Sequence, residues 1–417
     1  MDYYDGLWTR LSTASAQSEW TRLERGIFAG CTLSVILFLA GFNILIEFVS
    51  AKRFPSFQLE NGNSLPLLRG FMDDLSVMTT GVPYGREILE RVEFVLEWAR
   101  MKPKASKSRS CVIIKGRCMN VEPFVVGNEV IPSLQRKPLR TMGRDYDASL
   151  TDINMRVDLV KQINDGLRCI DKSFATGIMK LFTYQTRLLP KICWPIMIHE
   201  IPLSWVEKYD KRICVFFRKW LGVSKSLSSV ALFSKDSPLP LPLTSLETEF
   251  KRRKVGALFS LKHSTDKNIS LNIPKLKTGR KFDAEKCLND AEIDINVDKL
   301  VGTKAIGRRG LGSRKKTERL QKMIGNKVRL HEDQRLYAKA VNQKVQGKWT
   351  QWKSLIQRDM SWSALLRSSR QILSFSLGVT YDTLGTPVNL KRWNLVDSDT
   401  CDLCESRCSV QHILSGC

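Results

Sequence analysis

The feature that most constrains the fold is a short segment, residues 65–80, in which two adjacent aspartates interrupt an apolar run. Its centre is Phe71-Met72-Asp73-Asp74, and a stretch rich in Val, Leu and Thr follows. This pattern predicts a β-hairpin whose tight turn carries the two acids at the end of a sheet. Neighbouring carboxylates in a cleft ionise together at low cost only when cations lie between them, and Mg²⁺ ions that hold a triphosphate are one natural partner. A solvated turn is the simpler explanation of an isolated Asp-Asp pair, so the flanking segments decide between the two.

Two flanking segments add to this turn. Residues 26–38 contain a Gly-x-x-x-Gly-Cys-x-x-Ser element, and residues 96–110 are a helix end followed by Pro-x-x-x-Lys-Ser. In this order the three motifs resemble the palm of a reverse transcriptase, and more narrowly the polymerase of a non-LTR retrotransposon. In that family the glycine–serine element packs beneath the incoming nucleotide and template. The aromatic-x-Asp-Asp turn carries metal-binding carboxylates, and the lysine lies near the triphosphate.

The resemblance implies a role for each matching residue. Asp73 and Asp74 would be catalytic and would ligate Mg²⁺ in a two-metal site, with Asp73 the firmer ligand. Lys107 would be the catalytic lysine that assists the pyrophosphate leaving group. The sequence departs from the family at Ala29, where many members have Gln, which implies looser positioning of the nucleotide. The residues expected beside the nucleotide are Gly30, Ser34 and Phe71.

The segment before residue 26 lacks the family's first catalytic aspartate. In the family that residue lies on an apolar strand well upstream, whereas Asp2 and Asp5 are too close to Gly26 and have no apolar context. The fingers that supply basic residues to the triphosphate are missing too. We therefore expect a polymerase fragment that is inactive alone. A catalytically dead nucleic-acid-binding remnant is the rival interpretation.

Charge points to a polyanionic partner. The chain has 66 Lys and Arg against 42 Asp and Glu, a formal net charge of +24, which favours nucleic acid or an anionic membrane surface. The resemblance narrows this to an RNA template and RNA/DNA duplex, with deoxynucleoside triphosphates bound by the parent enzyme. Eleven cysteines, an odd number with no signal peptide before them, predict a reduced intracellular setting, nucleus or cytoplasm.

Residues 26–49 leave a membrane alternative open. They contain a single charge, Glu47, and are long enough to span a bilayer. A palm helix covered on all sides by a sheet and other helices produces the same pattern. Because the Asp-Asp turn follows this segment, we expect a buried helix and no stable membrane association.

Apolar periodicity and composition divide the chain into five parts, and together they predict a mainly helical α+β fold. Residues 87–99 have helical periodicity, and residues 138–143 resemble the family's hairpin that grips the primer end. The glycine-rich basic part is expected to lie along phosphates, and a solvated linker is equally consistent with it. The expected parts are a partial palm (1–147), a helical thumb (148–262), a basic flexible linker (263–325), a helical C-terminal region (326–395) and a truncated zinc module (396–417).

The last part carries a C-x₂-C-x₇-H-x₄-C pattern. Two thiolates on a knuckle, followed by a His and a Cys about a turn apart, can surround Zn²⁺ tetrahedrally. The spacing also resembles the cysteine–histidine module at the C-terminal end of many non-LTR retrotransposon polymerases. Cys408 is a spare thiol inside the loop, often Gly in that family, and it could replace a ligand. The predicted ligands are Cys401, Cys404, His412 and Cys417.

Overall fold

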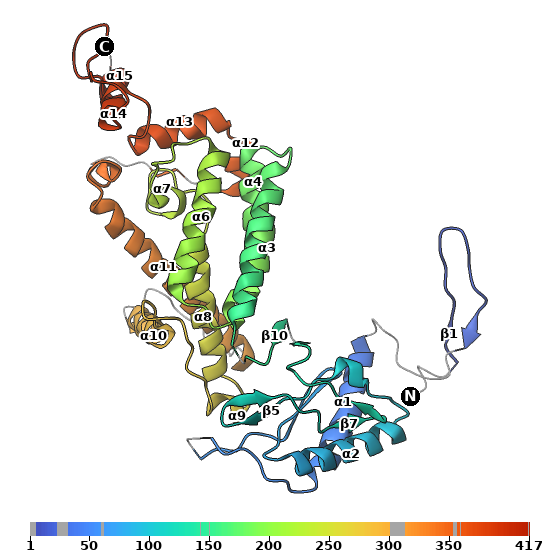
Figure 1. Cartoon of the computed structure of the whole chain (residues 1–417). Coiled ribbons are helices and arrows are strands. Elements are labelled where there is room, and N and C mark those ends of the chain that lie inside the picture. The colour runs from blue at the N-terminus through green and yellow to red at the C-terminus, as the bar shows by residue number, and fades with distance from the viewer. Residues whose placement is uncertain are drawn as a thin grey trace. The chain divides into compact units, whose positions relative to one another are not determined.

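The computed structural model describes residues 6–22, 32–59, 62–141, 143–149, 151–300, 313–352, 357–358, 360–415 and 417. The chain forms two compact units, Met1–Leu150 and Thr151–Cys417, called the N-terminal and the C-terminal unit below. Helices predominate, and the strands form small two-stranded antiparallel sheets (Figure 1). The predicted mainly helical α+β class is confirmed, whereas the division into palm and thumb stays a prediction.

The N-terminal unit combines helices with five antiparallel hairpins in its described residues. Its helices are α1 (Thr32–Ser50), α2 (Val82–Trp98) and the 3₁₀ turn η2 (Ala105–Lys107). Its hairpins are β1 (Trp8–Thr9) with β2 (Thr21–Arg22), β3 (Leu68–Phe71) with β4 (Asp74–Val77), β5 (Val112–Ile114) with β6 (Arg117–Met119), β7 (Val125–Val126) with β8 (Glu129–Val130), and β9 (Leu139–Thr141) with β10 (Arg144–Tyr146).

The core of the N-terminal unit lies between α1, α2 and the β3–β4 hairpin. Leu68 pairs with Val77 and Gly70 with Leu75, so these four residues share the face of the hairpin that packs on α1. A Cβ atom on Gly70 would lie 2.6 Å from the Phe42 ring, which shows how closely α1 approaches β3. The helix predicted over 87–99 is confirmed as α2, and it begins earlier because a proline in its first turn favours helix initiation. The buried residues that form this core are Leu45, Val49, Phe54, Leu68, Ile88, Val92 and Val95.

Helix α1 differs from the expectation of a helix covered on all sides, and that prediction is wrong. Only 22% of the window Leu33–Ser50, whose mean hydropathy is 2.1, is buried. Ile36 is 63% exposed and Ile44 is 53% exposed. The physical reason is that α1 packs through one face, marked by the buried Phe42 and Leu45, while its sequence is apolar all round. By length and composition alone this helix could cross a membrane.

The C-terminal unit consists of helices joined by loops, and none of the named strands lies in its described residues. Its main core is built by α3 to α8 together with α11, η4, α12 and α13. Helices α4 and α6 approach so closely that a Cβ atom on Gly177 would lie 1.8 Å from the carbonyl oxygen of Trp220. The helices are α3 (Ile153–Lys172), α4 (Gly177–Thr183), the π-helical turn η3 (Tyr184–Leu188), α5 (Leu189–Ile198), α6 (Leu203–Leu221), α7 (Ser229–Phe233), α8 (Leu246–Lys262), α9 (Lys267–Ser270), α10 (Ala284–Leu300), α11 (Ser313–Val341), the 3₁₀ turn η4 (Lys348–Gln351), α12 (Trp362–Arg367), α13 (Arg370–Thr380), α14 (Pro387–Arg392) and α15 (Val410–Ser415).

Residues 263–325 differ from the flexible linker that composition predicts. Helix α10 and the start of α11 lie within this range, and residues 301–312 lie outside the described residues. Helix α10 packs on α8 and α11. A side-chain contact also joins it to α11, because His331 Nε2 on α11 lies 2.7 Å from Asp294 Oδ2 on α10. Composition misleads here because the basic, glycine-rich residues concentrate outside α10, whose own sequence has more acidic than basic residues. The residues that α10 buries include Leu288, Ala291 and Ile295.

Candidate functional site

The predicted carboxylate turn is present at the tip of the β3–β4 hairpin. Phe71 pairs with Asp74, so Met72 and Asp73 form a two-residue turn. Met72 has φ +53°, in the left-handed region that a non-glycine side chain occupies at a cost of about 1 kcal/mol. All four residues of the turn are exposed. The hairpin therefore presents both carboxylates to solvent on a strained turn.

A second hairpin reaches this turn. The Thr141 hydroxyl on β9 donates a hydrogen bond to Asp74 Oδ2 at 2.8 Å. Thr141 belongs to the segment 138–143 that resembles the primer-gripping hairpin, and this segment contains strand β9 of the β9–β10 hairpin, whereas β10 follows it. Residues 67 positions apart in the sequence are thus brought together at the acids.

The turn does not complete a two-metal site by itself. Among the described residues, no third His, Cys, Asp or Glu gathers with Asp73 and Asp74 into a group that could hold an ion. The residues present therefore do not fit a complete pair of Mg²⁺ ions, and no step of a polymerase reaction follows from them.

The structure describes three of the other predicted nucleotide-site residues, Lys107, Ser34 and Phe71, and of these Phe71 lies at the turn itself, where it pairs with Asp74. Lys107 is exposed at the end of η2, and no hydrogen bond or ion pair joins it to either aspartate. Ser34 is buried near the start of α1. Phe71 is 54% exposed on β3. Gly30 lies outside the described residues, and the roles of all four stay predictions.

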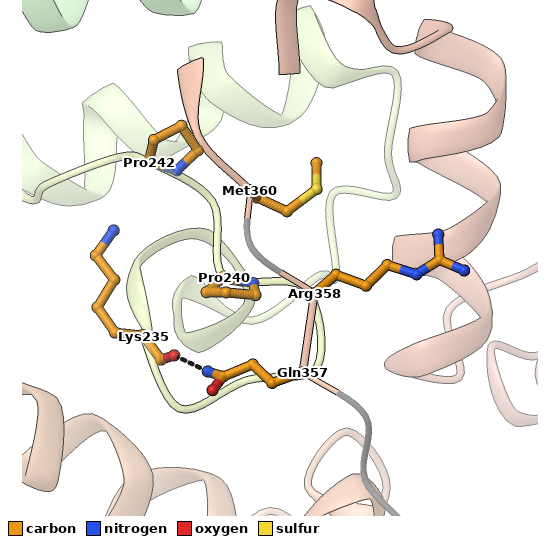
Figure 2. A pocket seen from close by; sticks show the side chains of 6 residues that line it. All are labelled: Lys235, Pro240, Pro242, Gln357, Arg358 and Met360. Carbon is orange, nitrogen blue, oxygen red and sulfur yellow. Dashed lines mark hydrogen bonds between the residues drawn. The ribbon is translucent and has the colours of Figure 1, made fainter. Parts of the chain in front are cut away.

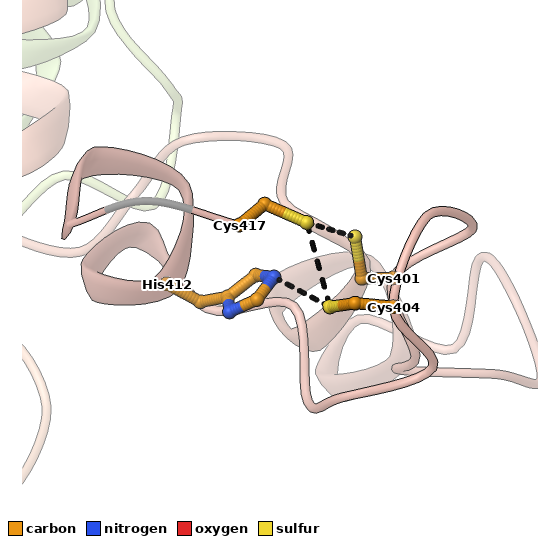
Figure 3. A group of neighbouring side chains, drawn as sticks. All are labelled: Cys401, Cys404, His412 and Cys417. Carbon is orange, nitrogen blue, oxygen red and sulfur yellow. Dashed lines mark hydrogen bonds between the residues drawn. The ribbon is translucent and has the colours of Figure 1, made fainter.

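The C-terminal cysteine–histidine cluster does gather as predicted (Figure 3). One ligand atom from each of the four residues lies within 4.8 Å of the others. Sulfur–sulfur distances are 3.5 Å for Cys401–Cys417 and 3.4 Å for Cys404–Cys417, and Cys404 Sγ lies 3.3 Å from His412 Nε2. A tetrahedral Zn²⁺ with Zn–S near 2.3 Å places two sulfurs about 3.8 Å apart. The four ligand atoms therefore fit zinc with only small movements.

Local backbone geometry prepares two of these thiols for a metal. The Leu403 N–H lowers the pKa of Cys401 to about 7, and the Ser406 N–H lowers the pKa of Cys404. Hydrogen bonds with Cys404 and Cys401 raise the pKa of Cys417 to about 12. A bound Zn²⁺ would supply the positive charge that removes this last proton, since thiolates are the zinc ligands.

Cys408 lies next to Cys401 but is not one of the four gathered residues. Its side chain is buried, its N–H donates to the Asp399 carbonyl at 2.8 Å, and its own carbonyl accepts the Val388 N–H at 3.3 Å. Cys408 thus links the module to the start of α14 through its backbone, and its Sγ is not among the four gathered ligand atoms. This supports its exclusion from the ligand set.

A shallow pocket in the C-terminal unit has a volume of about 440 Å³ (Figure 2). The Lys235 ammonium donates to the carbonyl oxygens of Leu241 at 2.6 Å and Leu243 at 3.0 Å. Burial lowers the pKa of Lys235. Because its charge is already satisfied by loop carbonyls, we assign no anion site to this pocket. The lining residues are Lys235, Pro240, Pro242, Gln357, Arg358 and Met360.

Sequence reasoning did not find the buried polar pair of Asp152 and His199. The His199 Nδ1 lies 2.7 Å from Asp152 Oδ1, and both side chains are almost fully enclosed. The buried Lys254 ammonium donates to the His199 carbonyl at 2.6 Å and so holds α8 against the end of α5. These residues are 47 or more positions apart, and nothing in their local sequence signals the pairing. Their role in the fold is structural.

Comparison with known proteins relates this chain to a retrotransposon protein. No family model matches the chain. The chain is 25% identical over 227 residues to the retrovirus-related Pol polyprotein from type-2 retrotransposable element R2DM of Drosophila melanogaster. The similarity supports a retrotransposon-related family. The matched region covers 53% of this chain and 21% of that Pol polyprotein, so the chain spans only about a fifth of its length.

Proposed function

We propose that this chain is a fragment of the RNA-directed DNA polymerase of a non-LTR retrotransposon, which binds an RNA template and RNA/DNA duplex but does not polymerise alone. The observation that carries the proposal is the strained Asp73–Asp74 turn held against the β9–β10 hairpin by Thr141. The similarity of the chain to a retrotransposon Pol polyprotein supports the same proposal. The expected setting is the nucleus or cytoplasm.

The missing activity follows from the number of carboxylates at the turn. The parent reaction joins a primer 3′-hydroxyl to the α-phosphate of a deoxynucleoside triphosphate and releases pyrophosphate. The resemblance implies three carboxylates around the metals, and the described residues gather two. We expect the purified chain to incorporate no deoxynucleotide on a primed RNA template above an Asp73→Asn control. Primer extension that depends on Asp73 would contradict this and imply that another acid completes the site.

Binding rests on exposed cations that no acid neutralises. On α6, the side chains of Lys208, Lys211 and Arg212 are exposed on one face, and none has an ion-pair partner among the described residues. The one half-exposed acid of that helix, Glu207, already pairs with Lys281 at 2.7 Å. A polyanion such as a duplex backbone is the partner that such a face fits.

The salt dependence of duplex binding tests this proposal. Each neutralised phosphate releases condensed counterion, so log affinity should fall linearly with log salt. Replacing Lys208, Lys211 and Arg212 together with glutamine should flatten that slope by about one unit per lost contact. Lys281→Gln is the matched control, because Glu207 already neutralises this lysine. If the triple variant keeps the wild-type salt slope, α6 is not part of the duplex-binding surface.

We expect a second group of basic residues to contact the duplex backbone as well. Arg314, Lys315 and Lys316 fall in the first turn of α11, and their side chains lie outside the described residues. Neutralising them should also flatten the slope. We expect duplex to bind more tightly than free single strand and with little sequence preference, since backbone contacts carry no base information.

The dead-remnant alternative predicts the same binding without any restorable activity. Supplying an upstream palm segment with its aspartate in trans should restore Asp73-dependent extension only if the chain is a piece of a working enzyme.

The membrane alternative is favoured by one observation, the exposed apolar face of α1. A protein anchored through α1 should float with liposomes and should ignore RNA/DNA duplex at low salt. That outcome would overturn the polymerase proposal. Duplex binding by a chain that stays behind in the flotation gradient would exclude the membrane alternative.

A further inference from the structure

A continuous helical segment of the C-terminal unit, residues 177–198, has an unusual charge pattern. It runs through α4, η3 and α5 without a break. Between residues 172 and 199 the chain has no aspartate or glutamate and carries four cations, Lys172, Lys180, Arg187 and Lys191. A surface helix normally mixes both signs, so this segment has a locally positive potential that its own residues do not cancel.

Burial separates this segment into two faces. Towards the core, Tyr184, Ile192 and Cys193 are fully buried. The opposite face is exposed and carries Arg187 and Lys191, four residues apart, with Trp194 one further turn along. Residues at spacings of three and four lie next to each other on a helix. Two cations and an indole ring therefore form one row, which we call the Trp194 row.

The members of the Trp194 row have no partners in the described residues. Neither Arg187 nor Lys191 makes an ion pair or a side-chain hydrogen bond there, unlike Lys219, which pairs with Asp171 at 2.7 Å. Trp194 is 49% exposed and stacks on no other ring of the described chain. Both the charge and the flat apolar surface are thus available to a ligand.

The row is held on a rigid support. The π-helical turn η3 precedes Pro190, whose ring nitrogen cannot donate to the carbonyl four residues earlier, and a widened turn accommodates that loss. The side chain of Gln185 accepts the Thr244 N–H at 3.2 Å, which ties η3 to the loop before α8. Helix α5 also packs along α8. A fixed aromatic surface loses little conformational entropy when a ligand stacks on it.

We infer that the Trp194 row is a contact site for single-stranded nucleic acid, with an unpaired base on the Trp194 ring and phosphates on Arg187 and Lys191. This inference rests on the proposed function and adds a second kind of partner structure to it. Base–indole stacking accepts any base, because every base has a flat face. The bases inside a duplex are stacked on each other and cannot reach the ring, so the row fits the unpaired part of a template rather than its paired part.

The test compares two ligands on the full chain. One is a blunt RNA/DNA duplex, and the other is the same duplex with a single-stranded RNA extension of about 8 nucleotides, within the length that one aromatic binding module covers. Trp194→Ala should weaken binding of the extended duplex about 10-fold and leave the blunt duplex unchanged. Trp194→Phe should retain most of the affinity, because a smaller ring still stacks.

Two further variants sharpen the result. Replacing Arg187 and Lys191 with glutamine should flatten the salt slope for a free single strand by about 1.4 units, at about 0.7 per phosphate. Trp98→Ala is the matched control, because Trp98 is 73% exposed but follows Glu97 on a helix that also carries Glu90 and Glu93. Trp98→Ala should change neither the affinity for the blunt duplex nor the affinity for the extended duplex. Unchanged circular dichroism and melting temperature establish that each variant is folded.

The outcomes separate this inference from the proposed function. If the wild-type chain binds both ligands and Trp194→Ala binds the extended duplex equally well, the inference is wrong and the proposed function stands. An equal loss on both ligands would also overturn the inference, because it would place Trp194 against paired nucleic acid. If the wild-type chain binds neither ligand at low salt, the proposed function itself is wrong.

Discussion

Replacing Asp210 with asparagine should make the stability of the C-terminal unit less dependent on pH. Asp210 lies on α6 and is buried. Its Oδ1 accepts the N–H of Leu246, the first residue of α8, at 2.7 Å. Burial raises the pKa of Asp210 from 3.8 to about 7, although the hydrogen bond from Leu246 opposes the rise. An asparagine side chain has a carbonyl oxygen that can accept the same N–H, and it carries no charge.

The sign of the effect follows from proton linkage. Because the pKa is higher in the folded state, the folded chain binds this proton more tightly than the unfolded chain. Asp210 therefore stabilises the fold fully below about pH 4, and this contribution is lost as the pH rises through 7. A pKa raised from 3.8 to about 7 corresponds to about 4 kcal/mol, at 1.36 kcal/mol per unit. The advantage of Asp210→Asn over wild type should grow by about that amount between pH 4 and pH 8.

Urea unfolding followed by tryptophan fluorescence at several pH values measures this difference. Asp165→Asn, on the exposed side of α3, makes the same chemical change and serves as the control. Its free energy of unfolding should stay parallel to that of wild type. A difference between Asp210→Asn and wild type that does not vary with pH would refute the reasoning, because it would mean that buried Asp210 keeps an ordinary pKa.

Three other predictions test further features of the structure. Elemental analysis should find one zinc ion per wild-type chain, which Cys404→Ser should lose and Cys408→Ser should keep; loss in both variants would make Cys408 a ligand. Gly177→Ala should destabilise the C-terminal unit by about 3 kcal/mol, because its new methyl overlaps a backbone oxygen of α6. Gly256→Ala on α8 is the contrast: its methyl meets only the Gln321 side chain, at an ordinary contact distance of 3.8 Å, so it should stabilise by about 0.5–1 kcal/mol, and similar thermal midpoints for the two variants would contradict this. Met72→Gly should raise the free energy of unfolding of the N-terminal unit by about 1 kcal/mol, because glycine adopts a positive φ without strain. Chemical denaturation measures this free energy, and a lower value for the variant than for wild type would show that the turn is not strained.

The features that sequence alone could predict are local. The hairpin around Asp73 and Asp74 follows from apolar strands on both sides of a short polar break, so a few neighbouring residues determine it. The gathering of the four cysteine and histidine residues was predictable because a two-residue knuckle and a helical turn fix most of the geometry. Local sequence does not show whether a carboxylate gains a partner from a distant segment. The contact from Thr141 to Asp74 depends on packing across 67 positions.

The features that sequence could not predict depend on what lies opposite a residue. The apolar pattern of α1 is the same whether one side of the helix or all sides are covered, so its exposure was not foreseeable. Trp194 has the same sequence context as many core aromatics, and only the burial of its neighbours shows that it points outward. In residues 263–325 the glycines and cations of one stretch dominated the composition and concealed α10.

The exposed face of α1 has a consequence for the lifetime of the chain in a cell. Residues such as Ile36 and Ile44 offer chaperones and the degradation machinery the kind of apolar surface that normally marks an incompletely folded protein. Steady-state abundance would then depend on how quickly a partner surface covers α1 after synthesis, rather than on the free energy of unfolding alone. A chain expressed by itself should therefore turn over quickly.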